Sequence, residues 1–250
     1  MTRLFDSHAD EIEALSTPGI VFNRPPRFTY GRENDQMAAI YELQVYEIGL
    51  RYLPNNRETN YLRCVRIENL PDGVKLQEVL AQICGGAVFS AQLLNTVPIS
   101  GYHTALVVFV RQSAAETFTQ YAKNNGIWFK GLRAVVAMVN TPTYPMPRKY
   151  EHLLSQGYSR CLVINHATPD LVDRLHSVLN DCRGCSDFIE HCEEDFETAD
   201  GSIKIRFHAV KNSMVAYELL TKHPAFKHCR FSFAVDPCSR TPAPESTLAR

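Results

Sequence analysis

The stretch 63-RCVRIENLPDGVKLQEVLAQICGG-86 decides the fold. Val65 and Ile67 alternate with polar residues, which is typical of a strand with one buried face. Beyond a turn, apolar residues recur at the spacing of a helix: Val74, Leu76, Val79, Leu80 and Ile83. The stretch therefore predicts a strand, a turn and an amphipathic helix.

The same pattern returns in 160-RCLVINHATPDLVDRLHSVLNDCRG-184. Each stretch begins with Arg-Cys and ends with Cys-x-Gly. A second pair of stretches, 104-TALVVFVRQSAAETFTQYAKNNG-126 and 202-SIKIRFHAVKNSMVAYELLTKHP-224, predicts a strand, a short polar turn and a helix in each case. Two copies at so long a period indicate two similar domains rather than a solenoid.

The complete pattern predicts an α+β protein made of two ferredoxin-like β-α-β-β-α-β sandwiches. Each has a four-stranded antiparallel sheet with two helices on one face, and its other face is open. In the first copy we expect strands near 65–67, 88–94, 106–110 and 133–139, with helices over 74–83 and 114–122. In the second we expect strands at 161–166, 186–192, 202–208 and 229–235, helices at 169–181 and 212–221, and an acidic loop over 190–201.

The predicted domain organisation follows from these elements. Residues 59–140 and 158–236 are the two domains, and residues 141–157 form a proline-containing linker. Residues 34–58 are an extension that alternates like a strand but also suits an amphipathic helix, and docking of this extension on the first domain is one of the alternatives. Residues 1–33 and the tail 237–250 are expected to be disordered.

Two short motifs in each copy resemble those of the RNA recognition motif (RRM) family. The hexamers are 65-VRIENL-70 and 162-LVINHA-167, and the octamers are 102-YHTALVVF-109 and 200-DGSIKIRF-207. The core-facing positions match the family. The resemblance covers residues near 60–140 and 158–236, and it implies the RRM fold and binding of single-stranded RNA on the open face of the sheet.

The positions at which that family stacks aromatic rings on bases hold other residues here. They are Arg66, Thr104 and Leu106 in the first copy, and Val163, Ser202 and Lys204 in the second. Without rings, binding is expected to be weak and to depend on cations and polar groups. The candidate RNA-binding residues are Arg66, Thr104, Leu106, Arg133, Arg148, Lys149, Lys204, Arg206 and Arg230.

A second hypothesis is a protein-interaction module that keeps the fold and has lost RNA binding. Leu106, Val108 and Val135 give the first sheet an apolar centre, and a patch of that kind is usually covered. RNA, a partner protein and another part of this chain all remain open as the cover.

The segment 126-GIWFKGLR-133 bears on peptide binding. Some family members bind peptides through an Arg-x-Phe loop at this place. Phe129 and Gly131 are kept, but Ile127 stands where the arginine would be. Trp128 suits either an exposed anchor or a packed residue.

Composition and charge narrow the function classes. The net charge is −1 and the isoelectric point about 6.7, which argues against tight non-specific binding to nucleic acid. Lys and Arg outnumber Asp and Glu between residues 60 and 140, whereas the reverse holds between 158 and 236. The chain contains no run of about 18 apolar residues, so the sequence does not predict a membrane span. Eight cysteines without a secretory signal favour an intracellular protein, nuclear or cytoplasmic.

Metal and catalytic sites are not predicted. The run 182-CRGCSDFIEHC-192 has spacings that could bind zinc, but Cys182 matches the helix end at Cys84 in the first copy, and a second cysteine pair is missing. His8 with Asp10, and His166 with Asp170, lack a nucleophile elbow or a glycine-rich phosphate loop beside them. We therefore expect no catalytic residue, no metal, no cofactor and no enzymatic activity.

Overall fold

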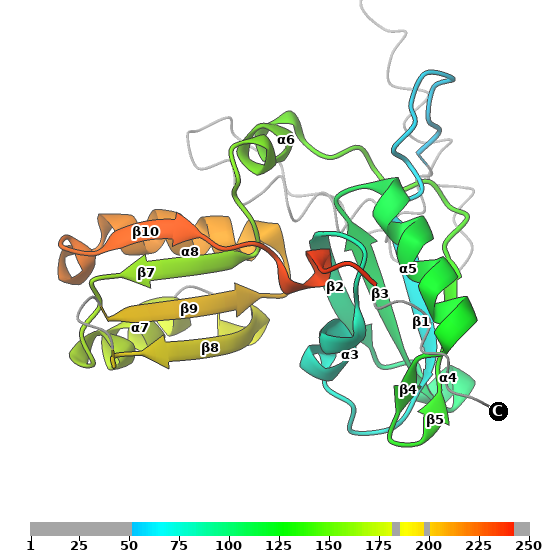
Figure 1. Cartoon of the computed structure of the whole chain (residues 1–250), viewed down its shortest axis with the longest axis horizontal. Coiled ribbons are helices and arrows are strands. Elements are labelled where there is room, and N and C mark those ends of the chain that lie inside the picture. The colour runs from blue at the N-terminus through cyan, green and yellow to red at the C-terminus, as the bar shows by residue number, and fades with distance from the viewer. Residues whose placement is uncertain (1–51, 182–185, 198–200, 243–250) are drawn as a thin grey trace, which may run out of the picture. The chain divides into compact units, whose positions relative to one another are not determined.

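The protein is described from a computed structural model that covers residues 52–181, 186–197 and 201–242. These residues form two sandwiches of strands and helices, one after the other along the chain (Figure 1). The predicted segment 1–33 and most of the predicted extension 34–58 lie outside the described residues, and so do residues 243–250 of the predicted tail.

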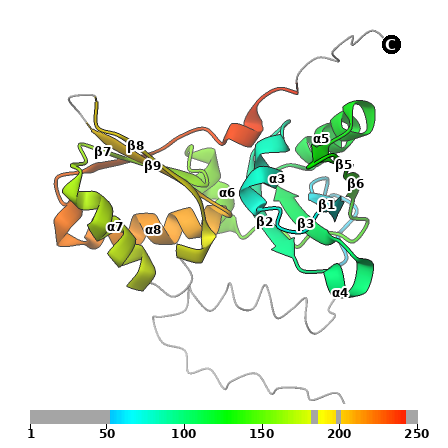
Figure 2. The same cartoon turned by 90° about the horizontal axis from the view of Figure 1, so that it is seen from below.

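The first sandwich has an antiparallel sheet in the order β2-β3-β1-β6. Its main elements are β1 (Cys64–Leu70), α3 (Leu76–Gln82), β2 (Val88–Leu94), β3 (His103–Phe109), α5 (Gln112–Asn125) and β6 (Val135–Met138). Short pieces lie between them: α4 (Val97–Ser100), β4 (Trp128–Phe129) and β5 (Leu132–Arg133). Helices α3 and α5 cover one face of the sheet, and their apolar residues share one core with the inward side chains of the strands (Figure 2).

The second sandwich repeats this topology, with the strand order β10-β7-β9-β8. Its elements are β7 (Cys161–Asn165), α7 (Asp170–Asp181), η1 (Ser186–Phe188), β8 (Ile189–Asp195), β9 (Ser202–Phe207), α8 (Val210–Lys222), η2 (Pro224–Phe226) and β10 (Arg230–Phe233). The linker contains α6 (Arg148–Ser155), and η3 (Pro237–Ser239) follows the last strand. The predicted fold class is confirmed in both halves.

Three predicted segments differ from the structure. The acidic run predicted as a loop is largely strand, because Glu190–Asp195 pair with β9 through a ladder that also buries Ile189 and Cys192 against the core. The strand predicted over 186–192 therefore begins and ends three residues later, at 189–195. In the first copy, Arg133 belongs to the β4–β5 hairpin, and the last strand begins at Val135.

The Arg-Cys repeat has a structural basis that the sequence did not reveal. Arg63 and Arg160 are both buried, and the guanidinium of each donates to the carbonyl of the last residue of the third strand of its sandwich. The Nη1–O distance is 3.2 Å from Arg63 to Phe109 and 3.0 Å from Arg160 to Phe207. In each copy the second strand has a bulge beside this arginine. The two copies thus hold an equivalent cation in an equivalent place.

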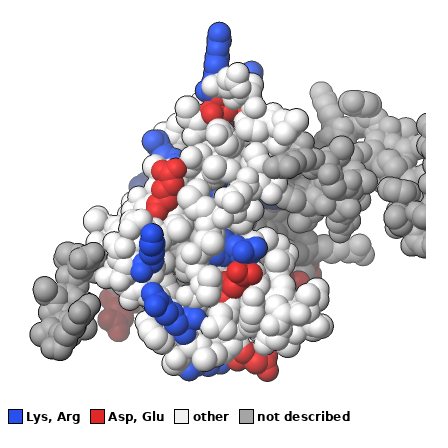
Figure 3. All heavy atoms as spheres, turned by 90° about the vertical axis from the view of Figure 1, so that its right-hand side faces the viewer, with Lys and Arg blue, Asp and Glu red and all other residues white. Residues whose placement is uncertain are grey.

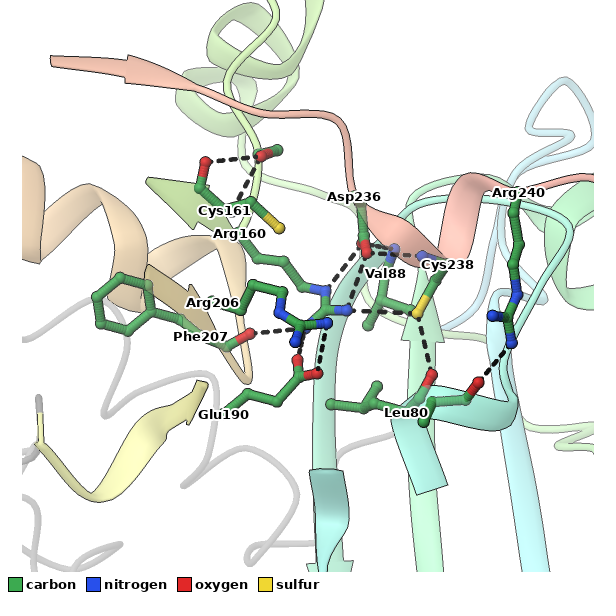
Figure 4. Close-up of polar contacts among 12 residues, drawn as sticks. Leu80, Val88, Arg160, Cys161, Glu190, Arg206, Phe207, Asp236, Cys238 and Arg240 are labelled. Carbon is green, nitrogen blue, oxygen red and sulfur yellow. Dashed lines mark hydrogen bonds and ion pairs between the residues drawn. The ribbon is translucent and has the colours of Figure 1, made fainter. Parts of the chain in front are cut away.

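The two buried arginines have different neighbours at the bulge. Arg63 lies over the ring of Phe89, with 5.8 Å between the guanidinium carbon and the ring centroid. Glu190 takes the equivalent position in the second copy, and its carboxylate pairs with Arg160. Asp236 pairs with Arg160 from the other side, at 2.9 Å from both Nε and Nη2 (Figure 4). The second sandwich therefore has a fully buried ion-pair triad.

The segment Asp236–Arg240, which we call the strap, connects this triad to the first sandwich. Asp236 accepts a hydrogen bond of 2.8 Å from the backbone N–H of Val88, and Cys238 is buried in the first core (Figure 4). Backbone N–H groups of Gly85 and Gly86 donate to the carbonyls of Arg240 and Cys238, at 2.9 and 3.1 Å. The expectation of a disordered tail from residue 237 is therefore wrong for the strap, because its backbone and side chains complete the first sandwich.

Gly86 lies where the turn after α3 passes close to α5. A Cβ atom at this position would come 2.2 Å from the Cβ of Ala114. Because overfilled cores strain their neighbours, Gly86→Ala is expected to lower the free energy of unfolding by about 1–3 kcal/mol. Urea unfolding measures the change. If the clash is the cause, adding Ala114→Gly to Gly86→Ala should recover part of the loss; equal stability of Gly86→Ala and the parent chain would contradict the predicted contact.

Candidate nucleic-acid interface

The open face of the first sheet, opposite α3 and α5, is set by the strand register. Arg66 on β1 lies opposite Leu106 on β3, and Ala137 on β6 lies opposite Arg66 on its other side. This places the hexamer and octamer positions side by side, as the resemblance implied. The other outward residues are Cys64, Glu68, Ser90, Gln92, Leu94, Thr104, Val108 and Val135. No strand of this sheet presents an aromatic ring on the open face within the described residues.

Thr104 points to the open side but is buried, at 5% exposed. Its hydroxyl lies 2.9 Å from the hydroxyl of Thr96, which precedes α4. Thr96 also donates to the carbonyl of Tyr102 at 2.6 Å. The connection between β2 and β3 therefore covers Thr104, and a base cannot reach this predicted position without moving that connection.

Of the two predicted cations of the first copy, Arg66 lies on the central strand β1 and Arg133 lies outside the four strands. Arg66 is half exposed, and its Nε lies 3.2 Å from a carboxylate oxygen of Glu68. Arg133 is exposed on β5, beyond the end of β1. The amide of Asn69, which is in β1, donates to the carbonyl of Arg133 at 2.8 Å and fixes the hairpin against the sheet.

The second sheet brings its three predicted cations to one open face. Lys204 and Arg206 project from β9, and Arg230 projects from β10, in register with Asn165 on β7. Val163 lies opposite Lys204 on one side and Ser232 on the other. The face is therefore polar, whereas that of the first sheet is mainly apolar.

Acidic residues of β8 lie beside two of these cations. Lys204 Nζ is 3.8 Å from Glu193, its partner across the strands, and Arg206 Nη1 is 3.5 Å from Glu190. Arg230 is exposed, with no ion pair to another described residue. The Lys204–Glu193 pair is exposed, so it contributes little and is screened by salt, whereas Glu190 is only 3% exposed and holds Arg206 more firmly. Lys204 and Arg230 therefore remain available to phosphate, and Arg206 is partly neutralised.

The linker cations are not part of either open face. Arg148 and Lys149 begin α6, and Lys149 Nζ lies 3.8 Å from Glu218 on α8, a helix on the opposite side of the second sheet from Lys204. On the side of the protein drawn in Figure 3, Lys and Arg lie among Asp and Glu and do not form one continuous basic field. The structure thus groups Arg66 with Leu106, and Lys204 with Arg206 and Arg230, and leaves the linker apart.

Sequence reasoning left open whether the cations of the second copy pair with the acidic stretch 190–200, and whether Trp128 is exposed or packed. Trp128 is 56% exposed, whereas Ile127 and Phe129 on either side of it are buried in the core. The sequence carries no signal for this, because Ile127, Trp128 and Phe129 are three consecutive apolar residues without alternation.

The half-buried Cys64 and the buried Cys161 are poor candidates for nucleophiles. Burial raises the pKa of Cys64 to about 11 and that of Cys161 to about 12, so both are protonated thiols at neutral pH. Among residues 52–181, 186–197 and 201–242, no group of three or more His, Cys, Asp and Glu side chains could hold a metal ion. Cys182 and Cys185 lie outside these ranges. No helix in the described part of the chain is long and apolar enough to span a membrane.

The sequence of the chain was compared with those of known families and proteins. No family model matches the chain. It is 24% identical over 198 residues to the RNA-binding protein MRN1 of Saccharomyces cerevisiae, in an alignment that covers 76% of this chain and 30% of MRN1. The chain therefore spans less than a third of that relative's length.

Solved structures with two or more RNA-binding domains are also similar. The three N-terminal RNA binding domains of the yeast splicing factor Prp24 share 14% identity, with a TM-score of 0.26 over 82% of this chain and 79% of that one. The first two RRM domains of the yeast poly(U) binding protein Pub1 share 12%, with a TM-score of 0.27 over 69% and 99%. The strand order within each sheet shows the fold independently of these values: each half of the chain has the β-α-β-β-α-β topology of a ferredoxin-like sandwich, the topology that the resemblance to the RRM family implied.

Proposed function

We propose that the protein binds single-stranded RNA through the open faces of its two sheets and catalyses no reaction. The observation that carries the proposal is the open face of the second sheet, where Lys204, Arg206 and Arg230 come together. Cations of this kind position a strand through its phosphates. The similarity to a protein named as RNA-binding supports the same conclusion.

Polar groups beside these cations suit a nucleic-acid strand. Asn165 and Ser232 lie on the same face, and the amide of Asn165 donates to the hydroxyl of Ser232 at 3.2 Å. Amide and hydroxyl groups can bond to phosphate, sugar or base edges. Because neither sheet presents a Phe, Tyr or Trp ring among its described open-face residues, we propose weak binding with little sequence preference.

The test is a titration of labelled single-stranded RNA, followed by fluorescence anisotropy at about 50 and 200 mM salt. The parent chain is expected to bind less tightly at the higher salt. Each phosphate contact that is lost lowers the salt slope by about 0.7 for a single strand. The double variant Lys204→Ala/Arg230→Ala should therefore bind more weakly and lower the slope by about 1.4.

The matched control is Lys222→Ala/Lys227→Ala, which removes the same charge. Lys222 ends α8 on the helical side of the second sheet, and Lys227 follows η2; both side chains are exposed. This control should keep the salt slope of the parent chain. Equal losses in the two double variants would mean that net charge, not the open face, governs binding, and the proposal would fail.

A protein partner on the first sheet is the second candidate function. The observation that favours it is Val135, which is 54% exposed on the same open face as the half-buried Leu106 and Val108, with β1 between them. If RNA does not bind even at low salt, and Val135→Asp abolishes the association with a partner without lowering the melting temperature, the second function replaces the first.

A further inference from the structure

The β4–β5 hairpin presents the ring that the strands of the first sheet lack. Trp128 on β4 is the cross-strand partner of Arg133 on β5, so the two side chains share one side of the hairpin. The chain then alternates into β6: Ala134 is buried in the core and Val135 is on the open face. Trp128 and Arg133 therefore lie on the side of the hairpin that continues the open face of the first sheet.

The hairpin is held firmly in this position. Ile127 and Phe129 are anchored in the first core on either side of Trp128, and the backbone of Ala134 donates to the carbonyl of Ile127 at 2.8 Å. Asn69 joins β1 to the carbonyl of Arg133, and Lys130 Nζ donates to the carbonyl of Asp72 at 3.3 Å. Figure 1 shows β4 and β5 together at one end of the first sandwich.

Gly126 allows the indole to lie close to the backbone. A Cβ atom here would come 2.9 Å from Nε1 of Trp128 and 3.4 Å from Nε of Arg133. The glycine also has a φ of 73°, which residues with a Cβ rarely adopt. The indole and the guanidinium therefore converge over this glycine, while 56% of Trp128 remains exposed.

We propose that Trp128 is a stacking platform for one nucleobase of single-stranded RNA, with Arg133 and Lys130 contacting the flanking phosphates. This inference rests on the proposed function and adds a site outside the strands. An exposed, preorganised indole offers a base a large planar surface at low entropic cost. The two exposed cations of the hairpin match the charge of the RNA backbone, which favours RNA over a peptide as the occupant.

Trp128 is the only tryptophan of the chain, so its fluorescence reports on this site alone. An unlabelled single-stranded RNA oligonucleotide is titrated into the full chain while indole emission and, with labelled RNA, anisotropy are followed. A base stacked on Trp128 should quench the emission, with the same dissociation constant as anisotropy gives.

The substitution Trp128→Ala should raise the dissociation constant about 5- to 150-fold, the range that removal of a stacking ring produces. Trp128→Phe keeps a ring and should recover much of the affinity. Phe188→Ala is the matched control, because Phe188 is an exposed ring (43%) of the second sandwich. Thermal unfolding of each variant checks that the fold is kept.

The possible outcomes separate this inference from the proposed function. If RNA binds by anisotropy but leaves the indole emission unchanged, and Trp128→Ala binds as tightly as the parent, the stacking site is refuted and RNA binding stands. If RNA does not bind the parent chain at all, both are refuted. Quenching together with a loss of affinity restricted to Trp128→Ala supports the site.

Discussion

Replacing Arg160 with methionine is expected to lower the free energy of unfolding by about 3–5 kcal/mol, the range for breaking a buried ion pair. The side chains of Arg160, Glu190 and Asp236 are each at most 3% exposed. Methionine fills similar volume but leaves the buried Asp236 without its cation, and leaves Glu190 with only the partly exposed Arg206 at 3.5 Å. Chemical denaturation with urea measures the loss.

The charge state of the triad supports this expectation. Burial alone lowers the pKa of Arg160, but the Asp236 carboxylate beside it outweighs burial and raises the pKa above its usual range. Arg160 is therefore cationic throughout the accessible pH range, and its removal leaves the buried carboxylate of Asp236 without a paired cation.

The exposed pair of Arg66 and Glu68 supplies the control. Arg66→Met should change stability by no more than about 1 kcal/mol, because an exposed pair is well solvated. Adding Glu190→Met to Arg160→Met removes one of the two buried carboxylates that had paired with Arg160. The double variant should therefore recover part of the lost stability. An Arg160→Met protein within about 1 kcal/mol of the parent chain would show that the triad is not buried as described.

Truncating Phe118 to alanine is expected to cost about 3–5 kcal/mol, as is usual for a large ring in a core. Phe118 is completely buried on α5, and its ring centroid lies 5.9 Å from that of Phe109 on β3. This contact joins the helical layer to the sheet of the first sandwich. The substitution removes the ring and leaves a cavity that α5 cannot close while Ala115 and Ala122 hold it against the strands.

Urea unfolding of Phe118→Ala measures this effect, with Phe188→Ala as the comparison. Phe188 is 43% exposed, so its loss should cost less than half as much. If the two truncations cost the same, Phe118 does not lie in a well-packed core.

The fold could be predicted because its signals are local. Val65, Ile67, Val107 and Phe109 alternate into one core, and the following helices bury residues at helical spacing. The same alternation placed Arg66 and Leu106 on the opposite face, where the structure pairs them directly. Side-chain direction in a regular strand follows from sequence parity alone.

The features that were missed depend on contacts between residues distant in sequence. The alternation along β3 places Thr104 on the open face, but Thr96 in the connection between β2 and β3 covers it. Glu190 and Glu193 have the composition of a loop, yet pairing with β9 makes them strand residues beside the cations. The burial of Arg160 requires Asp236, which lies at the other end of the second copy in the sequence. No local pattern carries this information.

The strap also affects the order in which the two sandwiches can finish folding during synthesis. Cys238 belongs to the core of the first sandwich, although it follows the whole second sandwich in sequence. Domains normally fold as they leave the ribosome, the N-terminal one first. Here the place of Cys238 in the first core stays unfilled until the second sandwich and the strap have been synthesised, so we expect the first sandwich to complete its packing only after the second has emerged.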